Sequence, residues 1–282
     1  MREQSWENYG GSPVKMKNGV QLLLNPNCAY SGVLFARRVS AVAELHFARN
    51  IINPGDIAID VGANIGYTTA ALSKFVGPYG KVLAFEPSPT TFSFLTRNLQ
   101  LNKCQNVTAY QVALAEKDNV GLLYESEHTS GDNRMYMPNS DPRDRLVQRQ
   151  AIEVEQKTLS TYLTEIDVAR LSFLKIDAQG YECRILEGAA ELLHESPMPA
   201  ILVEFTPRFL TEIDSTPEKL WDLAQQLDMG MALLKGAPRP GPRITLQPLD
   251  HSDFRRLTHQ LQRYGGPAGF EMLVLSRTPF NI

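Results

Sequence analysis

Apolar and polar positions along the chain predict strands and helices in alternation. Short runs of apolar, β-branched residues are typical of buried strands, and most are followed by segments with the three- to four-residue spacing of a helix. We expect strands at 57–61, 81–86, 107–114, 171–178, 199–205 and 271–276. We expect helices at 67–76, 89–102 and 183–193. Strands that alternate with helices favour an α/β fold, in which a mostly parallel sheet is covered on both faces.

The first 50 residues do not follow this alternation. Asn18-Gly19 lies between two short alternating runs, which predicts a β-hairpin, and residues 40–51 have helical spacing. We therefore expect residues 1–50 to form an N-terminal cap, made of a hairpin plus a helix, on a main domain that spans 51–282.

A second departure lies within the main domain, at about 120–158. Residues 120–127 and 151–158 alternate apolar with polar positions and flank a long loop. They predict a two-stranded excursion from the main sheet, with a loop that extends over one end of it. Further on, the Pro- and Gly-rich segment 235–247 is typical of a flexible link.

Composition and charge disfavour several classes of protein. The 282 residues are 43% hydrophobic and 21% charged, which is typical of a folded globular chain. A net charge of -3 without a block of basic residues gives no reason to expect nucleic acid or a membrane as a partner. The 3 widely spaced cysteines favour neither a disulfide framework nor a zinc site. We expect a cytoplasmic protein, because no apolar run has membrane length; a homodimer and other oligomeric states are open.

Four acidic residues stand at the carboxyl ends of predicted strands, where open α/β sheets bind their ligands. They are Asp60, Glu86, Asp177 and Glu204. Like charges gathered at one edge of a sheet destabilise the fold unless a ligand or a cation lies among them. The sequence therefore predicts a binding site at this edge.

The turn after the first of these strands indicates which cofactor the site could hold. Gly62 and Gly66 are spaced as G-x-x-x-G, whereas the pyrophosphate of a dinucleotide needs the closer backbone approach of G-x-G-x-x-G. Asp60 would repel a pyrophosphate and favour a cationic amino group, and Glu86 could accept hydrogen bonds from both hydroxyls of a ribose. S-adenosyl-L-methionine meets these conditions, because it combines a ribose, an amino group and a sulfonium and has no phosphate.

The segments DVGANIGYTT, AFEPSP, KIDAQGYE and VEF resemble the FkbM family of class I methyltransferases over roughly residues 45–210. The resemblance implies a Rossmann-like fold with a seven-stranded, mostly parallel sheet, helices on both faces and a last strand inserted antiparallel. It also implies S-adenosylmethionine-dependent O-methylation of a hydroxyl on a sugar, a natural product or another small metabolite. The chain departs from the family at Ala178-Gln179, where Val-Glu is more frequent, on the substrate side of the site.

The resemblance assigns cofactor contacts to ten residues. They are Asp60, Gly62, Ala63, Asn64 and Gly66 around the methionine part, with Thr68 as a further contact, Glu86 at the ribose, and Pro87, Ser88 and Ala113 along the adenine.

Methyl transfer to a hydroxyl also needs groups that orient the hydroxyl and remove its proton. Asp177 is the best-placed acid, either as the base or as the group that orients the methionine amino group, and Glu204 is a second candidate. His128, in the long loop, is a further candidate base. Glu182 could bind a substrate hydroxyl or offset the dipole of the helix that follows it. Candidates for closing the site over the substrate are Gly131, Asn133 and Arg134.

Several alternatives stay open at this point. We expect no metal, since KIDAQGYE supplies a single Asp where a magnesium site needs several oxygen ligands. The same fold could methylate the nitrogen of a peptide or amine, because the cofactor half of such a site is indifferent to the acceptor. A nicotinamide-dependent oxidoreductase is disfavoured by the glycine spacing, and a non-enzymatic binding protein by the four acids.

Overall fold

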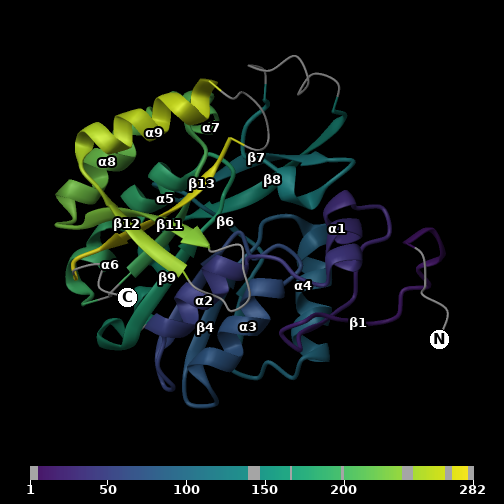
Figure 1. The fold of residues 1–282 in the computed structure, drawn as a ribbon. Helices are drawn as coiled ribbons and strands as arrows, with labels where there is room; N and C mark the ends of the chain where they lie inside the picture. The colour runs from purple at the N-terminus through teal and green to yellow at the C-terminus, as the bar shows by residue number, and fades with distance from the viewer. Residues whose placement is uncertain are drawn as a thin grey trace.

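A computed structural model of the chain describes residues 6–138, 147–165, 167–197, 200–236, 244–263 and 269–278. Its centre is a large twisted sheet, which has eight strands among those residues, with helices on both faces (Figure 1). The order across this sheet is β12-β11-β13-β10-β9-β3-β4-β5. The strands are β3 (Ile57–Val61), β4 (Lys81–Phe85), β5 (Val107–Tyr110), β9 (Leu171–Ile176), β10 (Ala200–Phe205), β11 (Gly230–Gly236), β12 (Ile244–Leu249) and β13 (Glu271–Ser276).

Most of the sheet is parallel, and one strand is inserted in the opposite direction. Strands β5, β4, β3, β9 and β10 are parallel neighbours, whereas β13 pairs antiparallel with both β10 and β11. The fold class predicted from the sequence is therefore confirmed. The sheet has one strand more than the seven that were expected, because β12 folds back antiparallel onto β11 at the edge. This strand overlaps the end of the predicted flexible link, of which residues 237–243 lie outside the described part of the chain.

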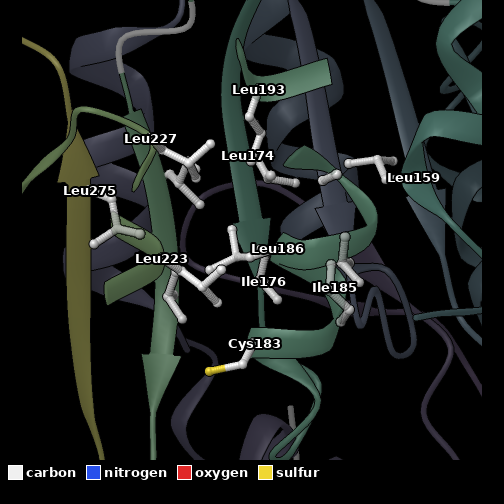
Figure 2. Close-up of a cluster of buried hydrophobic side chains, with 14 of the residues drawn as sticks. Leu159, Leu174, Ile176, Cys183, Ile185, Leu186, Leu193, Leu223, Leu227 and Leu275 are labelled. Atoms are coloured by element: carbon white, nitrogen blue, oxygen red, sulfur yellow. The ribbon is translucent and has the colours of Figure 1, made fainter. Parts of the chain in front are cut away.

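Alternation of side chains along the strands builds two hydrophobic layers. In β3, Ile57 and Ile59 face one layer and Ala58 faces the other. Figure 2 shows part of the first layer, which includes Ile176 of β9 and Leu186 of the helix at Glu182–Gly188. That layer is filled by α5 (Glu182–Gly188), α6 (Ala190–Glu195), α8 (Pro217–Gln226) and α9 (His251–Arg263). The second layer is filled by α2 (Val42–Ile51) and α3 (Tyr67–Val76).

The remaining helices connect and flank these layers. Helix α4 (Pro89–Leu101) follows β4, and Leu95 and Leu99 on it pack against Ala63 in the loop after β3. The segment predicted as one helix at 183–193 is divided into α5 and α6 at Ala189. Short elements are η4 (Leu159–Glu165), η5 (Val168–Arg170) and α7 (Pro207–Thr211). None of the helices that the structure describes is long and apolar enough to cross a membrane.

Within residues 6–51 the structure has two α-helices and a small hairpin. Strands β1 (Val14–Lys15) and β2 (Gln21–Leu22) pair antiparallel around Asn18-Gly19. Besides the short η1 (Trp6–Asn8), the segment has α1 (Ala29–Arg37), which the sequence did not predict, and α2. Helix α2 belongs to the core of the main sheet, because its Phe47 ring lies 6.3 Å from the ring of Phe173 on β9. A division of the chain near residue 50 stays a prediction.

The excursion at about 120–158 pairs β7 (Asn119–Ser126) with β8 (Arg149–Lys157) in antiparallel register. The segment expected to be one strand at 107–114 is two strands, because β5 ends at Tyr110 and β6 (Ala113–Leu114) pairs with β8 instead. The connecting loop begins with η2 (Ser130–Asp132), and its residues 139–146 lie outside the described part of the chain.

Candidate functional site

A cavity of about 310 Å³ lies at the carboxyl ends of the central strands. The strand order reverses there, because the chain continues from β3 to β4 and β5 on one side and later places β9 and β10 on the other. Most residues predicted for the site line this cavity: Gly62, Ala63, Asn64, Thr68, Glu86, Pro87, Ala113, Gly131, Asn133, Asp177 and Glu204.

The loop between β3 and α3 forms the wall nearest the strand ends. Gly62 has a φ of +74°, and a Cβ at this position would lie 1.9 Å from the carbonyl oxygen of Asp177. The backbone nitrogens of Gly62 and Ala63 both donate to the carbonyl of Phe85, at 3.0 Å each. Asn64, with a φ of +49°, continues the left-handed turn. The first glycine of the motif is therefore required because the loops after β3 and β9 touch.

Glu86 follows β4 and points its carboxyl at this loop. Its two oxygens accept hydrogen bonds from the backbone nitrogens of Asn64 and Ser88, at 3.0 Å each. Burial raises the pKa of Glu86 to about 7 in spite of these two hydrogen bonds, and the charges of Glu125 and Asp60 add to the rise. Near neutral pH the carboxyl is thus divided between two forms, and hydroxyl groups that donate to it would favour the ionised one.

Lys175 is a buried cation among the acids at the strand ends. The register of β3 and β9 places it opposite Asp60, and its Nζ lies 3.6 Å from Asp60 Oδ1 and 3.2 Å from Asp177 Oδ2. Burial opposes the charge, but the two carboxylates hold the pKa of Lys175 above its ordinary value. Asp60 is fully buried and also accepts a hydrogen bond of 2.6 Å from Thr69. Asp60 does not line the cavity and its carboxylate pairs with Lys175, so its contact with the cofactor stays a prediction.

Asp177 and Glu204 form a pair of carboxyls that an amide joins. Gln179 Nε2 donates to Asp177 Oδ1 at 3.1 Å and to Glu204 Oε2 at 2.7 Å. Burial raises the pKa of both acids, but Lys175 and Gln179 outweigh it at Asp177, whose pKa lies below its usual value. At Glu204 burial prevails, and the charges of Asp177 and Glu182 raise the pKa further, well above its usual value. An ionised carboxyl therefore stands beside one that keeps its proton to a higher pH, an arrangement suited to acid–base chemistry.

Two predicted residues belong to the polar interior or the surface instead of the cavity. Glu182 is buried, and its Oε1 accepts hydrogen bonds from the backbone nitrogens of Ala178 and Gly180, at 3.1 Å each. It therefore shapes the loop after β9 and does not line the cavity. His128 is exposed and does not line the cavity, so the structure does not place its imidazole as a base.

Arg134 is also buried away from the cavity, with 3% of its surface exposed. Its guanidinium pairs with Asp132 at 2.6 Å and with Glu212 at 3.7 Å, and it lies over the ring of Phe209 at 4.0 Å. A buried guanidinium needs such partners, and here they come from the excursion loop and from the segment around α7. Arg134 fastens the loop that carries Gly131 and Asn133, and its role in closing the site over the substrate stays a prediction.

Ser88 and Gly66 support the site from outside it. The Ser88 hydroxyl accepts a hydrogen bond from the backbone nitrogen of Thr91, which caps α4, and it donates to Glu125. Gly66 has a φ of +88°, and a Cβ there would lie 2.7 Å from Leu95 Cδ1. Neither residue lines the cavity, because both are used where the chain enters a helix.

The cavity wall includes residues that the sequence did not single out. Lys175 and Gln179 lie within the KIDAQGYE segment, and a lysine inside an apolar strand was a signal, since buried lysines need an acidic partner. The other wall residues lie far from the motifs in sequence, and only tertiary packing brings them together. Examples are Tyr30, Ser40, Glu44, Ser130, Met135, Phe270 and Met272.

The charges of the wall distinguish between cofactors. Among the described residues that line the cavity, the acids Glu44, Glu86, Asp177 and Glu204 outnumber the single cation Lys175. Such a wall repels a pyrophosphate and accepts hydroxyl donors and cationic groups. The residues present therefore fit a nucleoside cofactor that carries a positive charge and no phosphate.

Comparisons with known proteins point in the same direction. A family model described as the methyltransferase FkbM domain matches residues 60–230. Methyltransferase 1 of Beauveria bassiana is 31% identical over an alignment of 142 residues, and the match covers 46% of this chain and 57% of that protein. Methyltransferase sdnD of Sordaria araneosa is 30% identical over an alignment of 156 residues, and the match covers 47% of this chain and 60% of that protein. The chain thus aligns with 57% to 60% of the length of these curated relatives.

Solved structures with a similar arrangement are more distant in sequence. A SAM-dependent O-methyltransferase from Thermotoga maritima is 12% identical, with a TM-score of 0.43, over 95% of this chain and 78% of that chain. The TYW2 protein of M. jannaschii in complex with AdoMet is 14% identical, with a TM-score of 0.41, over 94% of this chain and 84% of that chain.

Proposed function

The chain belongs to the methyltransferase FkbM domain family, and we propose that it is an S-adenosylmethionine-dependent methyltransferase whose acceptor is a hydroxyl of a small metabolite, sugar or natural product. The observation that carries the proposal is the carboxyl pair of Asp177 and Glu204 in the wall of a cavity that also presents Glu86. One end of the cavity thus offers a ribose acceptor, and the other offers a group able to take up a proton.

The cofactor would be held by residues at the ends of β3 and β4. Glu86 would accept hydrogen bonds from the ribose, and Pro87 and Ala113 would border the adenine. The loop from Gly62 to Asn64 would surround the methionine part. When bound, this cofactor supplies a methyl group that its sulfonium has already activated for displacement onto the acceptor oxygen.

The carboxyl pair would manage the proton of the acceptor. Asp177, which Lys175 keeps ionised, accepts a hydrogen bond and orients the hydroxyl. Glu204 in its ionised form takes the hydroxyl proton at its carboxyl group and later releases it to water. Because its pKa lies well above that of an ordinary carboxyl, Glu204 is the stronger base of the two.

The test supplies the purified protein with S-adenosylmethionine labelled on its methyl group and with a panel of hydroxylated metabolites and matched amines. We expect label in O-methyl ethers, and a loss of at least about 100-fold in rate for Glu204→Gln. Cofactor affinity should be retained in that variant, and Glu191→Gln, which changes an exposed acid on α6, should keep the full rate. Label found only on nitrogen would replace the hydroxyl acceptor by an amine, and reduction of NAD without methyl transfer would overturn the proposal.

A further inference from the structure

Gln179 occupies an unfavourable backbone conformation at the acceptor end of the cavity. Its φ of +52° lies in the left-handed region, which side chains other than glycine and asparagine rarely adopt. Its amide nitrogen contacts both members of the carboxyl pair, Glu204 at 2.7 Å and Asp177 at 3.1 Å. A strained backbone that delivers one amide to two acids indicates a positioned group.

We propose that Gln179 is a positioning residue of the methyl-transfer site, whose amide hydrogens hold Glu204 beside Asp177 and allow Glu204 to give up its proton. This inference rests on the proposed function, in which ionised Glu204 takes the proton of the acceptor hydroxyl. Hydrogen bonds donated to both carboxyls stabilise the state in which both are ionised. Because an amide is neutral, Gln179 gives this support without adding a charge.

The surroundings of Glu204 explain why such support is needed. The titratable groups that face it or share the cavity wall with it are Asp177 and Lys175 at the end of β9, Glu182 of α5, Glu44 of α2, Glu86 after β4, and the tyrosines Tyr30, Tyr67 and Tyr181. Strand β13, which pairs with β10, places the uncharged Met272 opposite Glu204. Acids therefore outnumber the one cation, and ionisation of Glu204 is opposed by its neighbours.

Two substitutions distinguish the effect of the hydrogen bonds that Gln179 donates from the effect of its lack of charge. Q179L removes both donors without adding charge, and Q179E places a third carboxyl beside the pair. Neither residue is glycine, so the backbone conformation is as unfavourable as before. Both variants disfavour the state in which Asp177 and Glu204 are both ionised. The pH at which kcat rises should therefore be higher than in the wild type, by about one pH unit or more in Q179E and by less in Q179L.

The matched control is Q105E, which adds the same charge at an exposed position outside the cavity. At a pH where kcat still rises with pH, the kcat of Q179E should fall roughly tenfold for each pH unit by which its profile is shifted. The kcat of Q105E should match that of the wild type. The KM for S-adenosylmethionine should change less than about twofold, because the ribose acceptor Glu86 is untouched. Since glutamate has the shape of glutamine, Q179E also keeps the test available if Q179L does not fold.

A second measurement does not depend on activity. Carbon-13 NMR of protein labelled at its carboxyl carbons, without cofactor, follows the titration of each acid, and E204Q identifies the signal of Glu204. We expect this titration to move to higher pH in Q179L and Q179E. An unmoved titration, together with an unmoved pH profile and a lower melting temperature, would show a merely structural role and overturn the inference. Absence of methyl transfer in the wild type alongside a moved titration would instead reject the proposed function and keep the role of Gln179.

Discussion

Glu86→Gln should remove a pH dependence that the wild-type protein shows when it binds its cofactor. Burial raises the pKa of Glu86 to about 7, and ribose hydroxyls donate to the ionised carboxylate. Below that pH, binding must release a proton from Glu86. The affinity of the wild type for S-adenosylmethionine should therefore fall roughly tenfold for each pH unit below 7, which corresponds to about 1.4 kcal/mol. Above about pH 8 the affinity should be constant.

The same carboxyl affects the free energy of unfolding, with a sign that follows from its pKa. The folded-state pKa of about 7 lies above the ordinary value of 4.5, so the stabilisation is complete below the ordinary value and is lost as the pH rises through about 7. The difference between these two pKa values corresponds to roughly 3 kcal/mol of unfolding free energy, which the wild type loses as the pH rises. Glu86→Gln has no ionisable carboxyl at this position and should not show this loss. Burial raises the pKa of Glu182 to about 7 as well, but Glu182 does not line the cavity and should affect stability alone.

Calorimetric titration from about pH 5.5 to about pH 8.5, in buffers with different heats of ionisation, measures both the affinity and the protons released. Glu86→Gln should bind more weakly at pH 8 and release no proton at pH 6. The exposed-site variant Glu191→Gln should keep the wild-type slope. A wild-type affinity that does not change across this range, or a slope that survives in Glu86→Gln, would refute the role assigned to this carboxyl.

Three further substitutions test the supports of the site. Gly62→Ala should destabilise the fold and prevent cofactor binding, because its Cβ would meet the carbonyl of Asp177. The control Gly55→Ala has a φ of +99° and open space around it, and a thermal melt should show a loss of only about 1 kcal/mol. Lys175→Met should lower the free energy of unfolding by about 3–5 kcal/mol, because two buried carboxylates lose their cation. The loss should be larger at high pH, where both carboxyls are ionised, and an unchanged midpoint of urea unfolding would contradict the prediction. Arg134→Ala should cost about 3 kcal/mol or more, and the exposed Arg256→Ala less than about 0.5 kcal/mol, so equal losses would count against the buried network.

The sequence predicted the parts of the fold in which local pattern and tertiary structure agree. The buried run of β3 and the helix that follows at Tyr67–Val76 were predicted with the bounds that the structure has. Strand β12 was missed because it is an edge strand, in which every position is exposed or half-exposed and the apolar signal is weak. The division of 107–114 into β5 and β6 depends on pairing with β8, far along the chain, and periodicity does not report pairing.

The candidate site divides in the same way. The acids and glycines at strand ends follow from one topological rule, and Glu86 and Asp177 line the cavity as that rule predicts. The charge of Asp60 was assigned to a ligand because strand register is not visible in the sequence, and the register places Lys175 opposite it. The buried partners of Glu182 and Arg134 could not be predicted, because they come from the loop after β9 and from the segment around α7 and are known only from the tertiary structure.

The central claim is that the cavity binds S-adenosylmethionine and not a dinucleotide. Its most direct test is calorimetric titration of the purified protein at pH 8 with S-adenosylmethionine and, separately, with NAD. We predict one molecule of S-adenosylmethionine bound per chain, affinity that is strongly reduced in Glu86→Ala, and no heat of binding with NAD. Binding of NAD with no binding of S-adenosylmethionine would contradict it.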